Sequence, residues 1–147
     1  MIKKEMVSYC LDTLKKAGAD KAACSMNMME KKELNVEIGE MTLLRTTFNN
    51  SMGISVIKDQ KKGSTSINKT DKGSIDTAVA LVMAMAEGSQ PDDAYDIAEQ
   101  QPSKSFSKGD ESANLDTMYQ SLEEFVNYVK STYPKIQLEQ AIMDFNH

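Results

Sequence analysis

The 147-residue sequence has no tryptophan, two cysteines, three prolines and one histidine, which is its last residue, His147. One histidine excludes a histidine-rich zinc site and makes a Ser-His-Asp triad depend on the end of the chain. No apolar run approaches the roughly 18 residues of a membrane span, so a cytoplasmic location without a membrane partner is expected. Cys10 and Cys24 have neither metal-site nor redox-motif spacing, which predicts two buried, reduced thiols.

Positive charge is scarce where a nucleic acid would need it. The net charge is -5, and Arg45 is the only arginine. Residues 1–86 carry 13 basic and 10 acidic side chains, whereas residues 87–124 carry 2 and 10. A nucleic-acid-binding face normally has a strong basic excess, so DNA or RNA is not an expected partner.

Hydrophobic periodicity predicts an α+β fold. Apolar stripes predict helices at about 3–17, 71–87 and 115–132. Alternating apolar residues predict a mostly antiparallel or mixed sheet of five or six strands. The expected strands cover 22–28, 34–38, 41–48, 53–58, 64–67 and 135–145. The polar, acidic residues 89–114 are predicted to form a long loop. Residues 1–147 are expected to be a single domain, and a stop in strand-like sequence indicates the N-terminal fragment of a longer two-domain protein.

Turn chemistry separates the predicted strands. Gly39-Glu40, with glycine first, suits a type II′ hairpin turn, and "NNSMG" at 49–53 is also typical of a turn. "KDQKKG" at 58–63 predicts a four- or five-residue hairpin loop. It is not a phosphate-binding loop, because its lysines precede the glycine and a strand pattern follows. This basic turn, expected only to solubilise a strand end, contains Lys61, Lys62 and Gly63.

No constellation of side chains predicts catalysis or metal binding. Three aspartates cluster in the acidic loop but miss the EF-hand pattern: Asp92, Asp93 and Asp96. Four glutamates alternate with lysines or apolar residues, which is typical of the solvent-facing side of a hairpin: Glu30, Glu33, Glu37 and Glu40.

Four short motifs follow one another along the chain. They are a helix ending in Gly-Ala-Asp, the turn Ile38-Gly39-Glu40, the strand Gly53-Ile54-Ser55-Val56 and the basic turn from Lys61 to Ser66. Their order and spacing resemble the N-terminal domain of the TldD/PmbA family, over residues 8–100 closely and beyond them more loosely. Many TldD-type sequences carry a glycine where Gln60 stands, so the chain is more similar to the PmbA (TldE) branch.

The resemblance implies a non-catalytic domain of a peptidase subunit. In the TldD branch, a larger C-terminal domain carries a His-Glu-x-x-x-His zinc motif, so zinc is expected there or in a partner subunit and no cofactor is expected in this chain. The implied partners are a subunit of the same family, in a homo- or heterodimer, and an unfolded or modified peptide. The domain would help to build the assembly and enclose the peptide.

An exposed sheet edge can accept an extended peptide as an added strand, through backbone hydrogen bonds. The strands at 41–48 and 53–58 are the candidates, and their peptide-edge residues are Leu43, Arg45, Thr47, Ile54 and Val56. The family has also carried the label "modulator of DNA gyrase". Two alternatives therefore stay open: a nucleic-acid-associated modulator and a purely structural oligomerisation module. The substrate, the branch of the family and the role of residues 89–114 also stay open.

Overall fold

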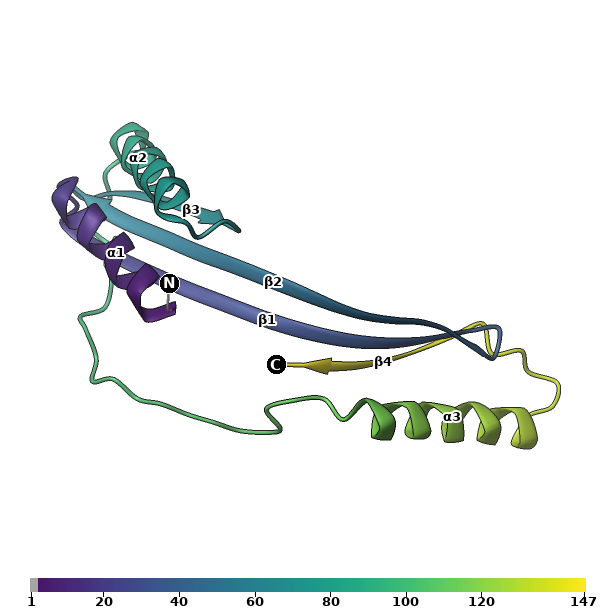
Figure 1. Cartoon of the computed structure of the whole chain (residues 1–147). Coiled ribbons are helices and arrows are strands. Elements are labelled where there is room, and N and C mark those ends of the chain that lie inside the picture. The colour runs from purple at the N-terminus through teal and green to yellow at the C-terminus, as the bar shows by residue number, and fades with distance from the viewer. Residues whose placement is uncertain (1–2) are drawn as a thin grey trace. The chain divides into compact units, whose positions relative to one another are not determined.

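The computed structural model describes residues 3–147 as three helices and one antiparallel four-stranded sheet (Figure 1). The elements in chain order are α1 (Lys3–Lys16), β1 (Lys21–Glu37), β2 (Glu40–Lys58), β3 (Lys61–Ile67), α2 (Lys72–Gly88), α3 (Leu115–Thr132) and β4 (Gln140–Asn146). The strand order is β3-β2-β1-β4, which confirms the predicted α+β class. None of the helices in residues 3–147 is long and apolar enough to cross a membrane.

The strand count of five or six is wrong because β1 and β2 are longer than expected. β1 has 17 residues and joins the predicted strands 22–28 and 34–38, and β2 has 19 and joins 41–48 and 53–58. The turn-like residues 49–53 continue β2, since Met52 is buried in the core and pairs with Ile67 of β3. Cross-strand packing here overrides local turn preference.

Both hairpin turns contain two residues with positive φ, as a type I′ turn requires. The first is Ile38–Gly39, with φ of 52° and 78°, and lies one residue before the predicted type II′ turn. The second is Asp59–Gln60, with φ of 51° and 58°. Lys58 pairs directly with Lys61, so the loop expected over "KDQKKG" is reduced to a tight turn.

The described chain divides into two units. Unit 1 contains the residues up to Met28 and Asn49–Lys104, and unit 2 contains Met29–Phe48 and Ser105–His147. β1 and β2 therefore contribute residues to both units. The connection between α2 and α3, residues 89–114, contains no helix or strand in the described structure.

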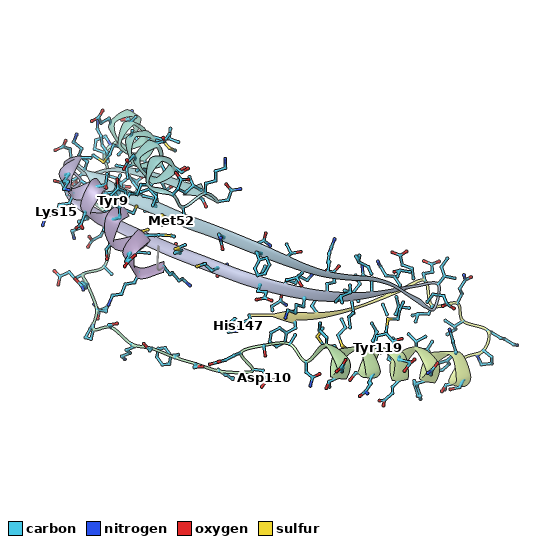
Figure 2. All side chains as sticks on the ribbon, viewed as in Figure 1. Tyr9, Lys15, Met52, Asp110, Tyr119 and His147 are labelled. Atoms are coloured by element: carbon cyan, nitrogen blue, oxygen red, sulfur yellow. The ribbon has the colours of Figure 1, made fainter. Side chains whose placement is uncertain are left out.

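Unit 1 has an aliphatic core in which α1 and α2 contact each other and α2 packs on β3. Its buried members are Cys10, Leu14, Met52, Ile54, Val56, Ile75, Ala78, Val79, Val82, Met83 and Ala86. Figure 2 marks Met52 and, on α1, Tyr9 in this unit. Asp71 caps α2, as its carboxylate accepts the Ser74 N–H at 3.0 Å.

Unit 2 has a smaller core between α3 and the strands. Its buried apolar residues are Leu34 and Val36 of β1 and Leu122 and Val126 of α3, surrounded by partly buried side chains. β4 pairs with β1, with Met143 opposite Leu34. The last strand begins at Gln140, five residues later than the predicted 135–145.

Candidate functional site

One edge of β2 in unit 2 lacks a strand partner. Residues 40–48 pair with β1 across the hairpin, while β3 pairs only with residues 52–58 of β2. No strand within residues 3–147 lies along the second edge of residues 40–48. In such an edge, alternate residues present unpaired backbone N–H and C=O groups that can pair with another chain.

This edge carries three large apolar side chains that are exposed. Leu43, Leu44 and Phe48 are all exposed, Phe48 at 71% of its surface. Proteins normally blunt such edges with charges, proline or a covering element. Residues 41–48 contain neither proline nor any charged residue except Arg45. The segment is therefore typical of a strand-pairing surface.

The structure separates the five predicted peptide-edge residues into two groups. Leu43, Arg45 and Thr47 lie in the unpaired segment. Ile54 and Val56 are at most 1% exposed and lie opposite Thr65 and Gly63 of β3. Their part of β2 is an inner strand between β1 and β3, so it has no edge for a peptide.

Arg45 also reaches a buried carboxylate on β1. Its Nη2 lies 2.8 Å from Glu33 Oε1, and Lys31 Nζ lies 2.7 Å from Glu33 Oε2 and 2.9 Å from Asp144 Oδ2. Glu33 is only 3% exposed, so its predicted position on a solvent-facing side is wrong. The reason is that β1 lies between β2 and β4, with Asp144 opposite Glu33.

The charges around Glu33 favour its ionised form. The hydrogen bond from Lys31 lowers the pKa of the Glu33 carboxyl; burial opposes this effect and Arg45 reinforces it. The same pairing, first with Glu33 and then with Asp144, raises the pKa of Lys31. The cluster thus links β4, β1 and the unpaired part of β2 through ion pairs, although Glu33 Oε1 makes no hydrogen bond of good geometry within residues 3–147.

Asn35 is a second buried polar residue of β1 in unit 2. It is 7% exposed, and its Oδ1 has no hydrogen-bond partner in the described part of the chain. Its backbone carbonyl accepts the Thr42 hydroxyl at 3.5 Å. A buried, unpaired amide oxygen costs roughly 1–3 kcal/mol. Sequence alternation did not single out this residue, because its burial depends on β4, which is distant in the sequence.

The residues of the basic turn make structural contacts within unit 1. Lys61 Nζ donates to the backbone carbonyl of Glu87 at 3.1 Å, and the Lys62 N–H donates to Ser89 Oγ at 3.1 Å. A cation near the last carbonyls of a helix is stabilising. Gly63 lets β3 approach the backbone of α2. These residues therefore hold the end of α2, beyond the solubilising role predicted for them.

The acidic residues do not assemble into a metal site in the part of the chain that the structure describes. No group of three or more His, Cys, Asp or Glu residues there could hold a metal ion. Asp96 forms an ion pair with Lys21, and Asp92 accepts the Ala94 N–H at 2.9 Å. Both carboxylates thus contact protein groups within unit 1.

Comparison with known sequences finds similarity to PmbA-type proteins. Residues 28–86 match the profile described as "PmbA/TldA metallopeptidase domain 1". The protein named "Metalloprotease PmbA homolog" from Haemophilus influenzae is 27% identical over 96 residues, which cover 65% of this chain and 21% of that protein. The matched part is thus about a fifth of the length of this curated relative.

Comparison with solved structures shows the same fold in longer chains. TldE from Thermococcus kodakarensis superposes with a TM-score of 0.73 at 15% identity, over 97% of this chain and 32% of that one. A proposed modulator of DNA gyrase from Bacteroides thetaiotaomicron superposes with a TM-score of 0.71 at 14% identity, over 97% of this chain and 34% of that one. A second proposed modulator of a DNA gyrase, from Thermotoga maritima, superposes with a TM-score of 0.61 at 10% identity, over 99% of this chain and 35% of that one. The chain spans about a third of each.

The fold and the site define an α+β domain that presents an unpaired strand edge and, among its described residues, no metal cluster. The profile match over residues 28–86 and the shared fold agree with each other: the chain is similar to the N-terminal domain of TldD/PmbA proteins.

Proposed function

We propose that this domain is the non-catalytic N-terminal part of a TldD/PmbA-type peptidase subunit. It contributes to assembly with a subunit of the same family and encloses an extended peptide substrate during proteolysis in the cytoplasm. The observation that carries the proposal is the unpaired edge of β2 over residues 40–48, with its exposed Leu43, Leu44 and Phe48. The described residues do not fit a zinc ion, so any zinc would be held outside this sequence or by the partner subunit.

Backbone pairing suits a substrate without a defined sequence. A peptide added to a sheet edge is held mainly by main-chain hydrogen bonds, which are the same for any residue except proline. An extended strand rises about 3.4 Å per residue, so the edge could align a peptide over roughly 30 Å. Leu43, Leu44 and Phe48 would add apolar contacts to either face of the added strand. The Glu33–Arg45 ion pair would hold β2 against β1 during binding.

Titration with an unfolded peptide tests the proposal. The amide resonances of residues 41–48 should shift in the ¹⁵N-labelled protein, while those of β3 should not. A peptide N-methylated at alternate residues, so that the edge facing β2 has no donors, should bind several-fold more weakly. The matched control is the same peptide methylated at the intervening residues. Saturating peptide without shifts in 41–48, or equal binding of both methylated peptides, would refute the proposal.

A purely structural role in oligomerisation is the second candidate, because α3 exposes aromatic side chains. Tyr119, Phe125 and Tyr128 are all exposed, and large exposed apolar patches are typical of interaction sites. Light scattering on the wild type and on the Phe125→Glu, Tyr128→Glu double variant separates the two roles. Loss of the oligomer with unchanged peptide binding would assign α3 to assembly and leave the β2 edge to the peptide.

A further inference from the structure

The two cysteines, distant in sequence, meet in the core of unit 1. Cys10 lies on α1 and is fully buried. Cys24 lies on β1, is partly exposed and packs against the same core cluster. Both thiols lie at one core cluster, and each shifts the pKa of the other. Because Cys24 stands 14 positions after Cys10, their contact depends on α1 packing over β1, and no spacing motif predicts it.

The two thiols are chemically different. The hydrogen bond to Cys24, with burial as a second cause, raises the pKa of Cys10. The same hydrogen bond lowers the pKa of Cys24, although burial opposes this effect. Cys24 therefore has more thiolate character, and Cys10 keeps its proton. A reachable thiolate beside a second, buried thiol is suited to disulfide exchange, because the thiolate attacks and the second thiol resolves the intermediate.

We propose that Cys10 and Cys24 are an oxidisable dithiol, which closes to a disulfide between α1 and β1 by exchange with a small disulfide such as oxidised glutathione. The Cys24 thiolate attacks one glutathione sulfur, which breaks that disulfide, forms a mixed disulfide and releases one glutathione thiolate. This thiolate takes up the Cys10 proton. The Cys10 sulfur then attacks the Cys24 sulfur and releases the second glutathione. Two electrons thus pass from the protein dithiol to glutathione.

The bond ties the N-terminal helix to the sheet of unit 1. It closes a loop through residues 11–23, which include the α1–β1 connection at Gly18. Such a closure restricts the unfolded chain. Oxidation therefore raises the thermal unfolding midpoint of the protein, and dithiothreitol reverses the rise.

Disulfide mapping of the wild-type protein is the direct test. The protein is equilibrated with mixtures of reduced and oxidised glutathione, quenched in acid, alkylated and digested with trypsin. Cys10 falls in the tryptic peptide 5–15 and Cys24 in the peptide 22–31. The expected result is a linked pair of these peptides, lost on reduction. Two free cysteines at every ratio, or a glutathione stably attached to each, would overturn the proposal.

Single variants test the order of the two steps. In Cys10→Ala, Cys24 loses its hydrogen-bond donor, so its alkylation by iodoacetamide at neutral pH should slow several-fold and its pH profile should move upward. Oxidation should then stop with one glutathione per chain. In Cys24→Ala, the buried Cys10 should stay unreactive in the folded protein. Faster reaction of Cys10 than of Cys24 would contradict the assigned roles. Circular dichroism checks that both variants fold, and the wild-type map decides the main question without them.

Discussion

Unit 1 and unit 2 are built on the same two long strands but are stabilised by different means. Unit 1 buries eleven apolar residues, from α1, α2 and β2, in one cluster. Unit 2 buries four in its cluster, together with Glu33 and Asn35. Since buried apolar surface is the main favourable term in folding, unit 1 should resist unfolding more strongly than unit 2.

The difference bears on the proposed function, because the unpaired edge of β2 lies in unit 2. Binding regions are drawn from the less stable parts of a protein, where local opening is easier. The small core of unit 2, its unpaired Asn35 oxygen and its charge cluster are properties of such a region. Unit 1, with its helices packed on the sheet, has the properties of a rigid scaffold.

The largest expected effect is that of Gly63→Ala in unit 1. A Cβ at this position would lie 2.2 Å from the backbone oxygen of Val82 and 2.8 Å from the backbone nitrogen of Ala86. Neither backbone atom can move without shifting α2, so the variant should lose about 4 kcal/mol of unfolding free energy, beyond the usual range for overpacking. Urea denaturation followed by circular dichroism measures the loss.

Gly88→Ala is the matched control for this substitution. Gly88 ends the same helix, and a Cβ there would meet nothing within 4 Å. The control should be neutral or gain a few tenths of a kcal/mol from its helix propensity. Equal losses in the two variants would show that the approach of β3 to α2 does not determine the stability of unit 1.

Leu122→Ala should open unit 2 selectively. Leu122 is buried on α3 against Leu34 and Val36, and a Leu-to-Ala change in a core costs about 3 kcal/mol. Amide hydrogen exchange should accelerate in α3 and in β4, while α2 keeps its protection. The control is Leu81→Ala, which changes an exposed leucine of α2. It should leave amide exchange in α3 and in β4 unchanged. Equal acceleration in α2 would mean that the two units unfold together and do not differ in their free energies of unfolding.

Helices and strands differ in how well the sequence predicts them. The helices were placed within a few residues because their apolar stripes and caps, such as Asp71, are local signals. The division of β1 and β2 was wrong because turn-forming residues, among them Asn49 and Asn50, continue a paired strand. Their conformation is determined by neighbouring strands, which no local pattern records.

The same limit applies to the candidate site. The segment 41–48 is one of two strands proposed as a peptide edge, and no described strand pairs with it on the side away from β1. Ile54 and Val56, in the other candidate strand, pack into the core with residues of α1 and α2, and β3 occupies the edge beside them. The burial of Glu33 and the contact between the two cysteines depend on β4 and α1, which pack from elsewhere in the sequence.

The charge cluster of unit 2 should make its stability depend on pH. The folded pKa of Glu33 is below its ordinary value of 4.5, so its stabilising contribution is complete above that value and is lost as the pH falls through the folded pKa. Glu33→Gln should therefore be less stable than the wild type at pH 7, and the difference should shrink in acid. Exposed Glu37, on the same strand, provides the control Glu37→Gln. A difference that grows as the pH falls would contradict the role of the cluster.

The smallest expected effects compare the hairpin turns of the two units. Ile38 and Gln60 both adopt positive φ, which is unfavourable for a side chain and most unfavourable for a β-branched one. Ile38→Asn creates the Asn-Gly pair preferred in a type I′ turn, and exposed Ile38 loses little burial. It should gain about 1 kcal/mol, and Gln60→Asn about half as much. Ile38→Val keeps the β-branch and should gain nothing. If Gln60→Asn gained more than Ile38→Asn in urea denaturation, the greater backbone strain would lie in unit 1, and unit 2 would owe its lower stability to its small core alone.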